Sequence, residues 1–261
     1  MTWHSLLSVV AVFVAYFLFE RWVRRAGLSA EIAVNIGPWG IAGGIIGARV
    51  VHVIDEWGYY SANPLQILAV WNGGVAIYGA IAGGVIAGCI YAWRKGYPVR
   101  KLMDIIAPAL IFAQAIGRLG DIINGEHFST PTSLPWSVIY TNPQSPGYGR
   151  PPSHPAVAYE LLADLAIFGV LWLLRDRLKP DGARFTVYAA LYALIRFPLS
   201  FLRLDSHSVL FGINQQGYLS IIVFAWAVAA LIAMHASFKK PALVTPPPAR
   251  PGPNTPRSRK T

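Results

Sequence analysis

Residues 117–127, GRLGDIINGEH, place charged and polar side chains together at the end of the apolar run IIAPALIFAQAI. An amphipathic helix of a soluble protein would distribute such residues along one face instead. Arg118 and Asp121 are three residues apart, so on a helix they are neighbours and can pair. In an apolar environment such a pair is less costly than either charge alone. Arginine is also well suited to phosphate, because its planar guanidinium donates two parallel hydrogen bonds to phosphate oxygens.

The elements that must position these residues are predicted to be membrane-spanning helices. Of the 261 residues, 54% are hydrophobic and only 13% are charged, whereas soluble proteins have about 25% charged residues. About 20 apolar residues cross a bilayer core, and seven stretches of suitable length span residues 3–19, 32–54, 68–93, 103–124, 156–174, 183–202 and 213–236. We therefore predict an all-α polytopic membrane protein whose seven transmembrane helices form one domain, residues 1–240.

The basic residues predict the orientation of these helices. Most of the 22 lysines and arginines lie after the first, third, fifth and seventh spans. The positive-inside rule therefore places the N-terminus outside and the C-terminus in the cytoplasm. Residues 125–155 become a small extracytoplasmic cap, and the Pro-rich, basic residues 241–261 become a disordered cytoplasmic tail. Because the net charge of +10 comes mainly from the inner segments, it does not predict nucleic acid as a partner.

Several arginines lie outside these basic segments. Arg49, Arg118 and Arg196 fall within spans two, four and six, and Arg203 closes the sixth span. A charged side chain at the centre of a membrane helix costs at least about 2.5–3.5 kcal/mol, so such residues are usually functional. All four fall in the outer half of the membrane, and their convergence predicts a shared anion site. The anion of an outer leaflet is a phospholipid phosphate, and transfer of part of that lipid to another molecule would fit.

Acidic and imidazole groups near these arginines are candidates for acid–base chemistry. Asp121, Glu126 and Glu160 lie near the outer arginines, and His127 and His154 flank the cap segment. The single cysteine and the spacing of His, Asp and Glu residues predict neither a disulfide framework nor a metal site.

Other polar and small residues have more ordinary interpretations. Asp104 and Asp164 are predicted to be counter-ions of the inner basic loops. Glycine pairs at 43–44, 73–74 and 83–84 fall inside spans two and three. They indicate either close packing of helices through small residues or room for a lipid or peptide to approach the backbone.

Five segments resemble, in the same order, the motifs of the prolipoprotein diacylglyceryl transferase family. GRLGDIINGEH is similar to the family pattern Gly-Arg-x-Gly-Asn-x-x-Asn-x-Glu. The other segments are VWNGGVAIYGAIAGG (70–84), SHPAVAYELL (153–162), RFPLSFLR (196–203) and INQQGYLSI (213–221). The resemblance extends along almost the whole chain and agrees with the seven predicted spans.

The resemblance implies a reaction in the bacterial cell (inner or plasma) membrane. The diacylglyceryl group of phosphatidylglycerol is transferred to the lipobox cysteine of a prolipoprotein signal peptide, which forms a thioether and releases glycerol phosphate. A thiol with a pKa near 8.5 must lose its proton to become a nucleophile, and the leaving phosphate needs stabilisation of its charge. Membrane lipids surround the reaction, and no cofactor is implied.

The resemblance also assigns roles by position. Residues implied to bind phosphatidylglycerol are Arg118, Asn124, Arg203 and Gly79, and Arg49 is predicted to join them because it lies at a similar depth in the membrane. Residues implied to be catalytic are Tyr78, Asp121, Glu126 and Arg196. Residues implied to shape the site or the cap are His127, His154, Tyr159 and Glu160.

Some positions depart from the family pattern. Asp121 replaces the usual asparagine, Tyr78 replaces the histidine proposed as a base in many members, and Ser200 replaces a glutamate of the sixth span. An N-terminal tyrosine of some members has no clear match, although Trp3 and His4 lie near that place. The group that takes the thiol proton is left open among Tyr78, Glu126, Asp121 and His127.

Two other interpretations compete with an active transferase. One is a non-catalytic membrane protein that binds or moves phospholipids, and the other is a catalytically inactive relative with a structural role. A rhomboid-type protease is not indicated, because no Gly-x-Ser-x-Gly segment occurs among the spans.

Overall fold

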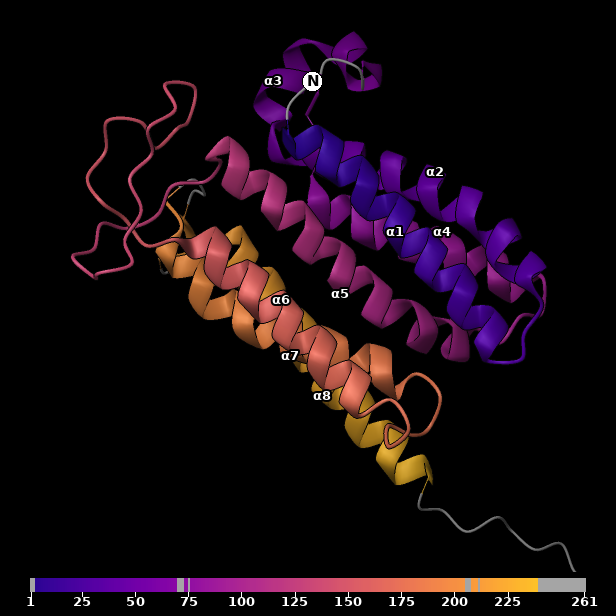
Figure 1. The fold of residues 1–261 in the computed structure, drawn as a ribbon. Helices are drawn as coiled ribbons and strands as arrows, with labels where there is room; N and C mark the ends of the chain where they lie inside the picture. The colour runs from indigo at the N-terminus through magenta and orange to yellow at the C-terminus, as the bar shows by residue number, and fades with distance from the viewer. Residues whose placement is uncertain (1–2, 70–72, 75, 205–207, 211, 239–261) are drawn as a thin grey trace, which may run out of the picture.

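The computed structural model describes residues 3–69, 73–74, 76–204, 208–210 and 212–238, so the predicted tail at 241–261 lies outside the described residues. Figure 1 shows a bundle of long helices. The elements are α1 (Trp3–Arg25), α2 (Ala30–Asp55), α3 (Trp57–Ala62), the 3-10 helix η1 (Pro64–Leu68), α4 (Ile77–Arg94), α5 (Val99–Asn124), α6 (Ala156–Leu173), α7 (Ala183–Leu202), β1 (Ser208–Leu210), β2 (Ile213–Asn214) and α8 (Gln215–Phe238).

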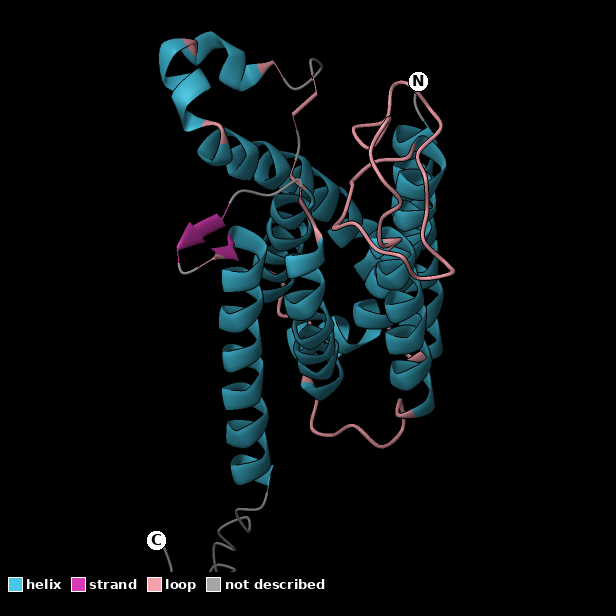
Figure 2. Ribbon diagram, turned by 90° about the vertical axis from the view of Figure 1, so that its left-hand side faces the viewer, coloured by secondary structure: helices cyan, strands magenta, loops and turns pink. Residues whose placement is uncertain are grey.

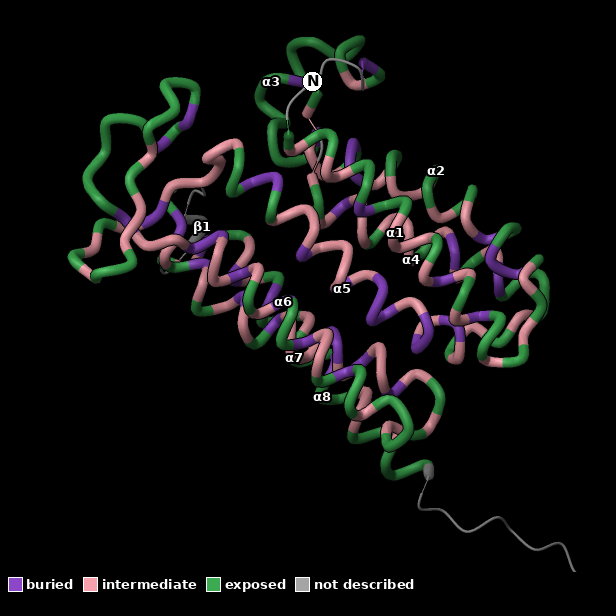
Figure 3. The backbone as a smooth tube through the Cα atoms, in the orientation of Figure 1, coloured by how far each residue is buried: buried purple, intermediate pink, exposed green. Residues whose placement is uncertain are grey.

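Seven of the described helices are long and apolar enough to cross a membrane, which confirms the predicted number of spans. They are α1, α2, α4, α5, α6, α7 and α8. Large apolar side chains on their outer faces are exposed, among them Phe13, Ile46, Leu173 and Ile232. Exposed positions follow the outer faces of several helices in Figure 3. Such surfaces are costly in water but suit contact with lipid chains.

The helices pack in pairs, and an irregular segment extends from one end of the bundle. α1 packs on α5, α2 on α4, and α7 on α8. The N-terminal end of α1 and the C-terminal end of α8 lie at opposite ends of the bundle (Figure 2). Residues 125–155 form a looped excursion beyond the ends of α5 and α6, at the end where α1 begins (Figures 1 and 2). This excursion coincides with the predicted cap segment, whose side of the membrane stays a prediction.

The third predicted span, 68–93, begins too early. The helix α4 starts only at Ile77, and α3 and η1 occupy part of the preceding segment. Gly73 and Gly74 have φ values of 83° and 78°, in the left-handed region that a right-handed helix does not contain. The glycine pair at 73–74 therefore lies in a connection before the helix, and the apolar residues around it misled the prediction.

The other two glycine pairs pack α2 against α4. A Cβ atom added at Gly47 would lie 2.9 Å from the Cα atom of Gly83 and would also overlap the carbonyl oxygen of Gly79. Gly43 and Gly83 face each other in the same way along the two helices. The packing interpretation of these pairs is confirmed, because glycine backbones of the two helices lie in close contact there.

Replacing Gly47 by alanine is expected to destabilise the bundle, because the new methyl group meets α4 backbone that cannot rotate away. Overpacking of this kind costs about 1–3 kcal/mol. Gly169→Ala in α6 is the matched control, since a Cβ atom there meets nothing within 4 Å. Thermal unfolding in detergent should show a lower Tm for Gly47→Ala than for the control; equal Tm values would contradict this packing.

Asp104 has a second role besides the predicted one. Its carboxylate accepts hydrogen bonds from the backbone N–H groups of Gly182 (2.7 Å) and Phe185 (2.9 Å), at the start of α7. The first N–H groups of a helix have no partners within the helix, so a carboxylate there caps it. Arg184 donates a hydrogen bond to the backbone carbonyl of Asp104, and its charge also acts on the Asp104 carboxylate, as predicted for a counter-ion.

Candidate active site

Most of the predicted site residues meet at the end of the bundle where α1 begins. Tyr78 lies in the first turn of α4, and Arg118 and Asp121 lie in the last turns of α5. Glu160 lies in the second turn of α6, and Arg196 lies near the end of α7. Because successive helices run in alternating directions, their starts and ends alternate along the chain and yet lie side by side in space.

Glu160 is the centre of this group. Arg118 Nη2 lies 2.8 Å from Glu160 Oε2, Arg196 Nη1 contacts Glu160 Oε1, and Arg203 Nη1 lies 3.5 Å from the same Oε1. The Glu160 side chain is only 5% exposed. The structure thus brings together three of the four predicted arginines. Glu160, predicted only to shape the site, is the group around which they gather.

The arginine cluster is defined as Arg118, Arg196, Arg203 and Glu160. Two further carboxylates lie beside Arg118: Asp121, which pairs with it, and Asp164, which is buried in the same pocket. The cluster thus gathers three guanidinium groups within a network of carboxylates. Guanidinium groups are well suited to donate charge-assisted hydrogen bonds to a phosphate.

Arg196 is held by three further helices at once. Its Nε donates a hydrogen bond to the hydroxyl of Tyr78 on α4 (2.7 Å), and its Nη2 donates to Oε1 of Gln216 on α8 (2.5 Å). Together with Glu160 on α6, these contacts fix the plane of the guanidinium. Sequence reasoning missed Gln216, although it lies in the segment INQQGYLSI that resembles the family.

Asp121 forms a second group beside the cluster. The predicted pair is present, with Arg118 Nη1 donating to Asp121 Oδ2 at 2.9 Å. Asp121 Oδ1 lies 2.5 Å from Nδ1 of His4 in the first turn of α1. Asp121 Oδ2 lies 4.0 Å from Nε2 of His127, whose Nδ1 accepts a hydrogen bond from Arg203 Nη2 at 2.7 Å. His127 thus lies between Asp121 and the arginine cluster.

His4 is a site residue that sequence reasoning missed. It is 117 residues from Asp121, and only the packing of α1 on α5 brings them together. Gly120 permits this approach, because a Cβ atom there would lie 2.9 Å from the Cα atom of His4. The one available signal was the proximity of His4 to the place of the family's N-terminal tyrosine.

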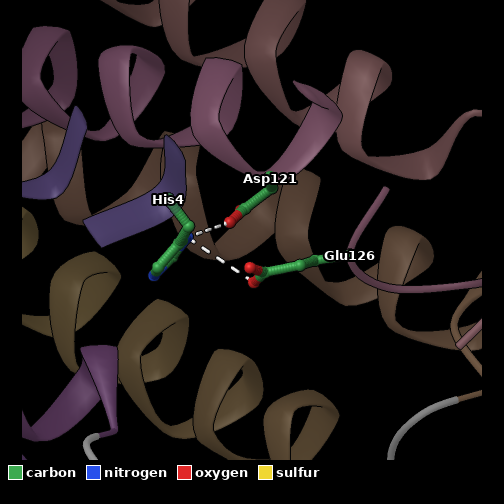
Figure 4. Close-up of side chains that lie close together, drawn as sticks. All are labelled: His4, Asp121 and Glu126. Carbon is green, nitrogen blue, oxygen red and sulfur yellow. Dashed lines mark hydrogen bonds and ion pairs between the residues drawn. The ribbon is translucent and has the colours of Figure 1, made fainter. Parts of the chain in front are cut away.

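His4, Asp121 and Glu126 lie close together in a way that residue spacing did not predict. Their nitrogen and oxygen atoms all lie within 4.8 Å of one another (Figure 4). Such a group has the dimensions of a cation site, but His4 Nδ1 is directed to Asp121 at hydrogen-bonding distance. We therefore interpret the group as a hydrogen-bonded pair with Glu126 beside it, at 3.6 Å from Nδ1. Glu126 also accepts a hydrogen bond from Asn124 (2.8 Å).

Arg49 lies apart from the cluster, although it was predicted to join it. Its guanidinium donates hydrogen bonds to backbone carbonyls of the segment that precedes α4, namely those of Gln66, Ile67, Ala69, Gly73 and Gly74. The contacts explain why an arginine is tolerated in α2: it satisfies the carbonyls of a non-helical segment. Its role in binding phosphatidylglycerol stays a prediction.

Three other predicted residues lie at the margins of the site. Gly79 is buried against Gly47 of α2, so its visible role is packing. His154 Nδ1 lies 3.4 Å from the hydroxyl of Tyr159, which also accepts a hydrogen bond from Trp136 Nε1 (2.7 Å). These contacts connect the 125–155 excursion to the start of α6.

A small pocket opens beneath the arginine cluster, between α5, α6 and α7. Its lining includes Arg118, Glu160, Asp164, Tyr192 and Arg196. Asp164, predicted to be a counter-ion of an inner loop, is buried here on the side of Arg118. The helical register of α6 explains the difference, since Asp164 is one turn from Glu160 on the same face.

Comparison with known proteins identifies related sequences. Residues 1–233 match the family model described as prolipoprotein diacylglyceryl transferase. The phosphatidylglycerol–prolipoprotein diacylglyceryl transferase of Thermosynechococcus vestitus is 37% identical over 213 residues, which cover 78% of this chain and 78% of the relative. The enzyme of the same name from Trichormus variabilis is 37% identical over 218 residues, 78% of this chain and 75% of the relative. That of Synechococcus elongatus is 34% identical over 241 residues, 89% of this chain and 83% of the relative.

Proposed function

The chain belongs to the prolipoprotein diacylglyceryl transferase family, and from this premise we propose that it transfers the diacylglyceryl group of phosphatidylglycerol to the cysteine of prolipoproteins. The thiol sulfur forms a thioether with the glyceryl carbon, and glycerol phosphate leaves. The substrates follow from the names of the relatives, and the lipobox around the cysteine follows from the resemblance of the motifs.

The observation that carries this proposal is the convergence of the arginine cluster on Glu160. Three guanidinium groups, from α5, from α7 and from the residue that follows α7, meet one buried carboxylate at an end of the bundle. A lipid phosphate at that end would find donors from Arg118, Arg196 and Arg203 already in place. Donors that are held before the reaction stabilise the charge that develops on a leaving phosphate at little cost of reorganisation.

The position of the cluster suits a substrate that stays in the bilayer. The seven apolar helices make this a multi-pass membrane protein, and acyl chains can lie along their exposed apolar faces while the headgroup reaches the ends of the helices. Arg24, Arg25, Arg94 and Lys95 lie at the opposite ends of α1 and α4 from the cluster. The positive-inside rule then supports an outer location for the cluster and for residues 125–155, in the bacterial inner or plasma membrane.

A transfer assay tests this function. The purified protein is incubated with phosphatidylglycerol and a peptide that contains a lipobox cysteine, and the mass of the peptide is followed together with release of glycerol phosphate. We expect a gain of one diacylglyceryl group per peptide and equimolar glycerol phosphate. A peptide with serine in place of the cysteine is the control. Retention of phosphatidylglycerol without any gain in peptide mass would contradict the transferase and favour a protein that only binds lipid.

A further inference from the structure

We propose that His4, oriented by Asp121, takes the proton from the thiol of the substrate cysteine. This assignment rests on the proposed transferase function, and it adds a group that the motifs of the family resemblance did not include. Three properties of His4 support this assignment: one of its ring nitrogens can accept a proton, that nitrogen is accessible, and nearby carboxylates stabilise the imidazolium that results.

The hydrogen bond to Asp121 determines which nitrogen of His4 is the acceptor. Asp121 pairs with the Arg118 guanidinium at 2.9 Å, which favours its ionised form, and an ionised carboxylate can only accept hydrogen bonds. At 2.5 Å from this carboxylate, His4 Nδ1 must therefore be the donor. In a neutral imidazole, Nε2 then has the free lone pair.

The free nitrogen is placed where a substrate can reach it. The His4 side chain is 40% exposed, whereas that of Asp121 is only 4% exposed. In Figure 4 one ring nitrogen faces Asp121 and Glu126, and the other points away from both. Within the part of the chain that the structure describes, no residue forms a hydrogen bond or ion pair with Nε2.

The surroundings also stabilise a protonated His4. Asp121 lies at 2.5 Å and Glu126 at 3.6 Å from Nδ1. A nearby positive charge, that of Arg118, lies on the other side of Asp121 and pairs with Asp121 and with Glu160. An oriented histidine with a carboxylate behind it is the arrangement that serves as a general base towards serine and cysteine nucleophiles.

The other candidates are less suited to this step. Arg203 donates a hydrogen bond to His127 Nδ1, so in neutral His127 the hydrogen is on Nε2, which faces Asp121. The Tyr78 oxygen already accepts a hydrogen bond from Arg196 (2.7 Å). Glu126 accepts a hydrogen bond from Asn124 and lies behind His4 Nδ1.

One side chain connects the proposed base to the phosphate site. Arg118 donates a hydrogen bond to Asp121 through Nη1 and pairs with Glu160 through Nη2.

In the proposed step, the S–H proton moves to His4 Nε2 and the thiolate attacks the glyceryl carbon. The carbon–sulfur bond forms while the bond from carbon to the phosphate oxygen breaks, and the electron pair leaves with glycerol phosphate. The imidazolium then returns its proton to the released phosphate or to water.

The test compares two peptides that differ in one atom. One has the lipobox cysteine, and the other has selenocysteine, whose selenol is already ionised at neutral pH and needs no base. His4→Ala should lower transfer to the cysteine peptide by about a hundredfold or more, the usual contribution of a general base. Transfer to the selenocysteine peptide should stay close to that of the wild type. His235→Ala is the matched histidine control, because His235 lies at the end of α8 that is far from the arginine cluster. Its rate of transfer to either peptide should equal that of the wild type.

Each outcome decides between this role and another. An equal loss with both peptides would show that His4 is structural, and full transfer to the cysteine peptide by His4→Ala would exclude it as the base. Both results leave the wild-type enzyme active, so the proposed function would stand. Wild-type protein that modifies neither peptide would overturn the function and this assignment together. The reactions are run with a chelator present; loss of wild-type transfer on chelation would contradict the assignment by indicating a cation at His4.

Discussion

Replacing Arg118 by alanine is expected to abolish transfer to the lipobox peptide, with a loss of at least about a hundredfold, the typical effect of removing one preorganised donor to a developing anion. Arg118 contacts both Asp121 and Glu160. Its removal therefore takes a phosphate donor from the arginine cluster and also the partner that orients Asp121. The loss should appear mainly in the rate of transfer per correctly folded molecule, measured by the gain in peptide mass.

Two further variants separate charge, geometry and folding in this experiment. Arg118→Lys retains the charge, but one ammonium cannot bridge both carboxylates as the forked guanidinium does, so an intermediate rate is expected. Arg24→Ala removes an exposed arginine that pairs with Glu20 one turn away, and it should behave as the wild type. Wild-type turnover in a folded Arg118→Ala protein would remove Arg118 from the site.

The second large effect is expected for Glu160→Gln, in the stability of the bundle. This change keeps the shape of the side chain but leaves three buried guanidinium groups without their central anion. Breaking a buried ion pair by removal of one partner costs about 3–5 kcal/mol. The Tm of the variant, measured in a detergent without charge, should therefore fall markedly. Transfer should fall as well, because the orientations of Arg118 and Arg196 depend on Glu160.

Added lipid provides an internal check on this variant. Phosphatidylglycerol should raise the Tm of Glu160→Gln more than that of the wild type, because its phosphate supplies the missing anion. Phosphatidylcholine, which has no net charge, should have a smaller effect. Glu31→Gln is the control, since Glu31 is exposed at the start of α2. If Glu160→Gln melts at the wild-type temperature, Glu160 does not hold the cluster together.

The features that were predictable from the sequence are those that depend on local patterns. Runs of about 20 apolar residues identified seven spans, because a bilayer core requires that length. The pairing of Arg118 with Asp121 followed from their separation of three residues on a helix. The glycine contacts between α2 and α4 were also indicated, because small residues repeated along two spans favour close packing.

The features that were not predictable depend on contacts between distant segments. Asp121 was predicted as the partner of Arg118, but its second partner, His4, became evident only when α1 was placed against α5. Arg49 was grouped with the other arginines by its depth in the membrane. Its actual partners are carbonyls of the connection before α4, part of which had been predicted as helix. Charge and depth alone do not show in which direction a side chain points.

The most direct test of the central claim is to locate the lipid phosphate. Phosphatidylglycerol with a photoactivatable group on its glycerol headgroup is bound to the protein, irradiated, and the modified peptides are identified by mass spectrometry. We expect modification at 117–127 and 196–203, around the arginine cluster, and competition by excess unlabelled phosphatidylglycerol. Modification confined to the outer faces of α2 and α4, or modification of the cluster that unlabelled lipid does not reduce, would contradict the assignment of the phosphate to these arginines.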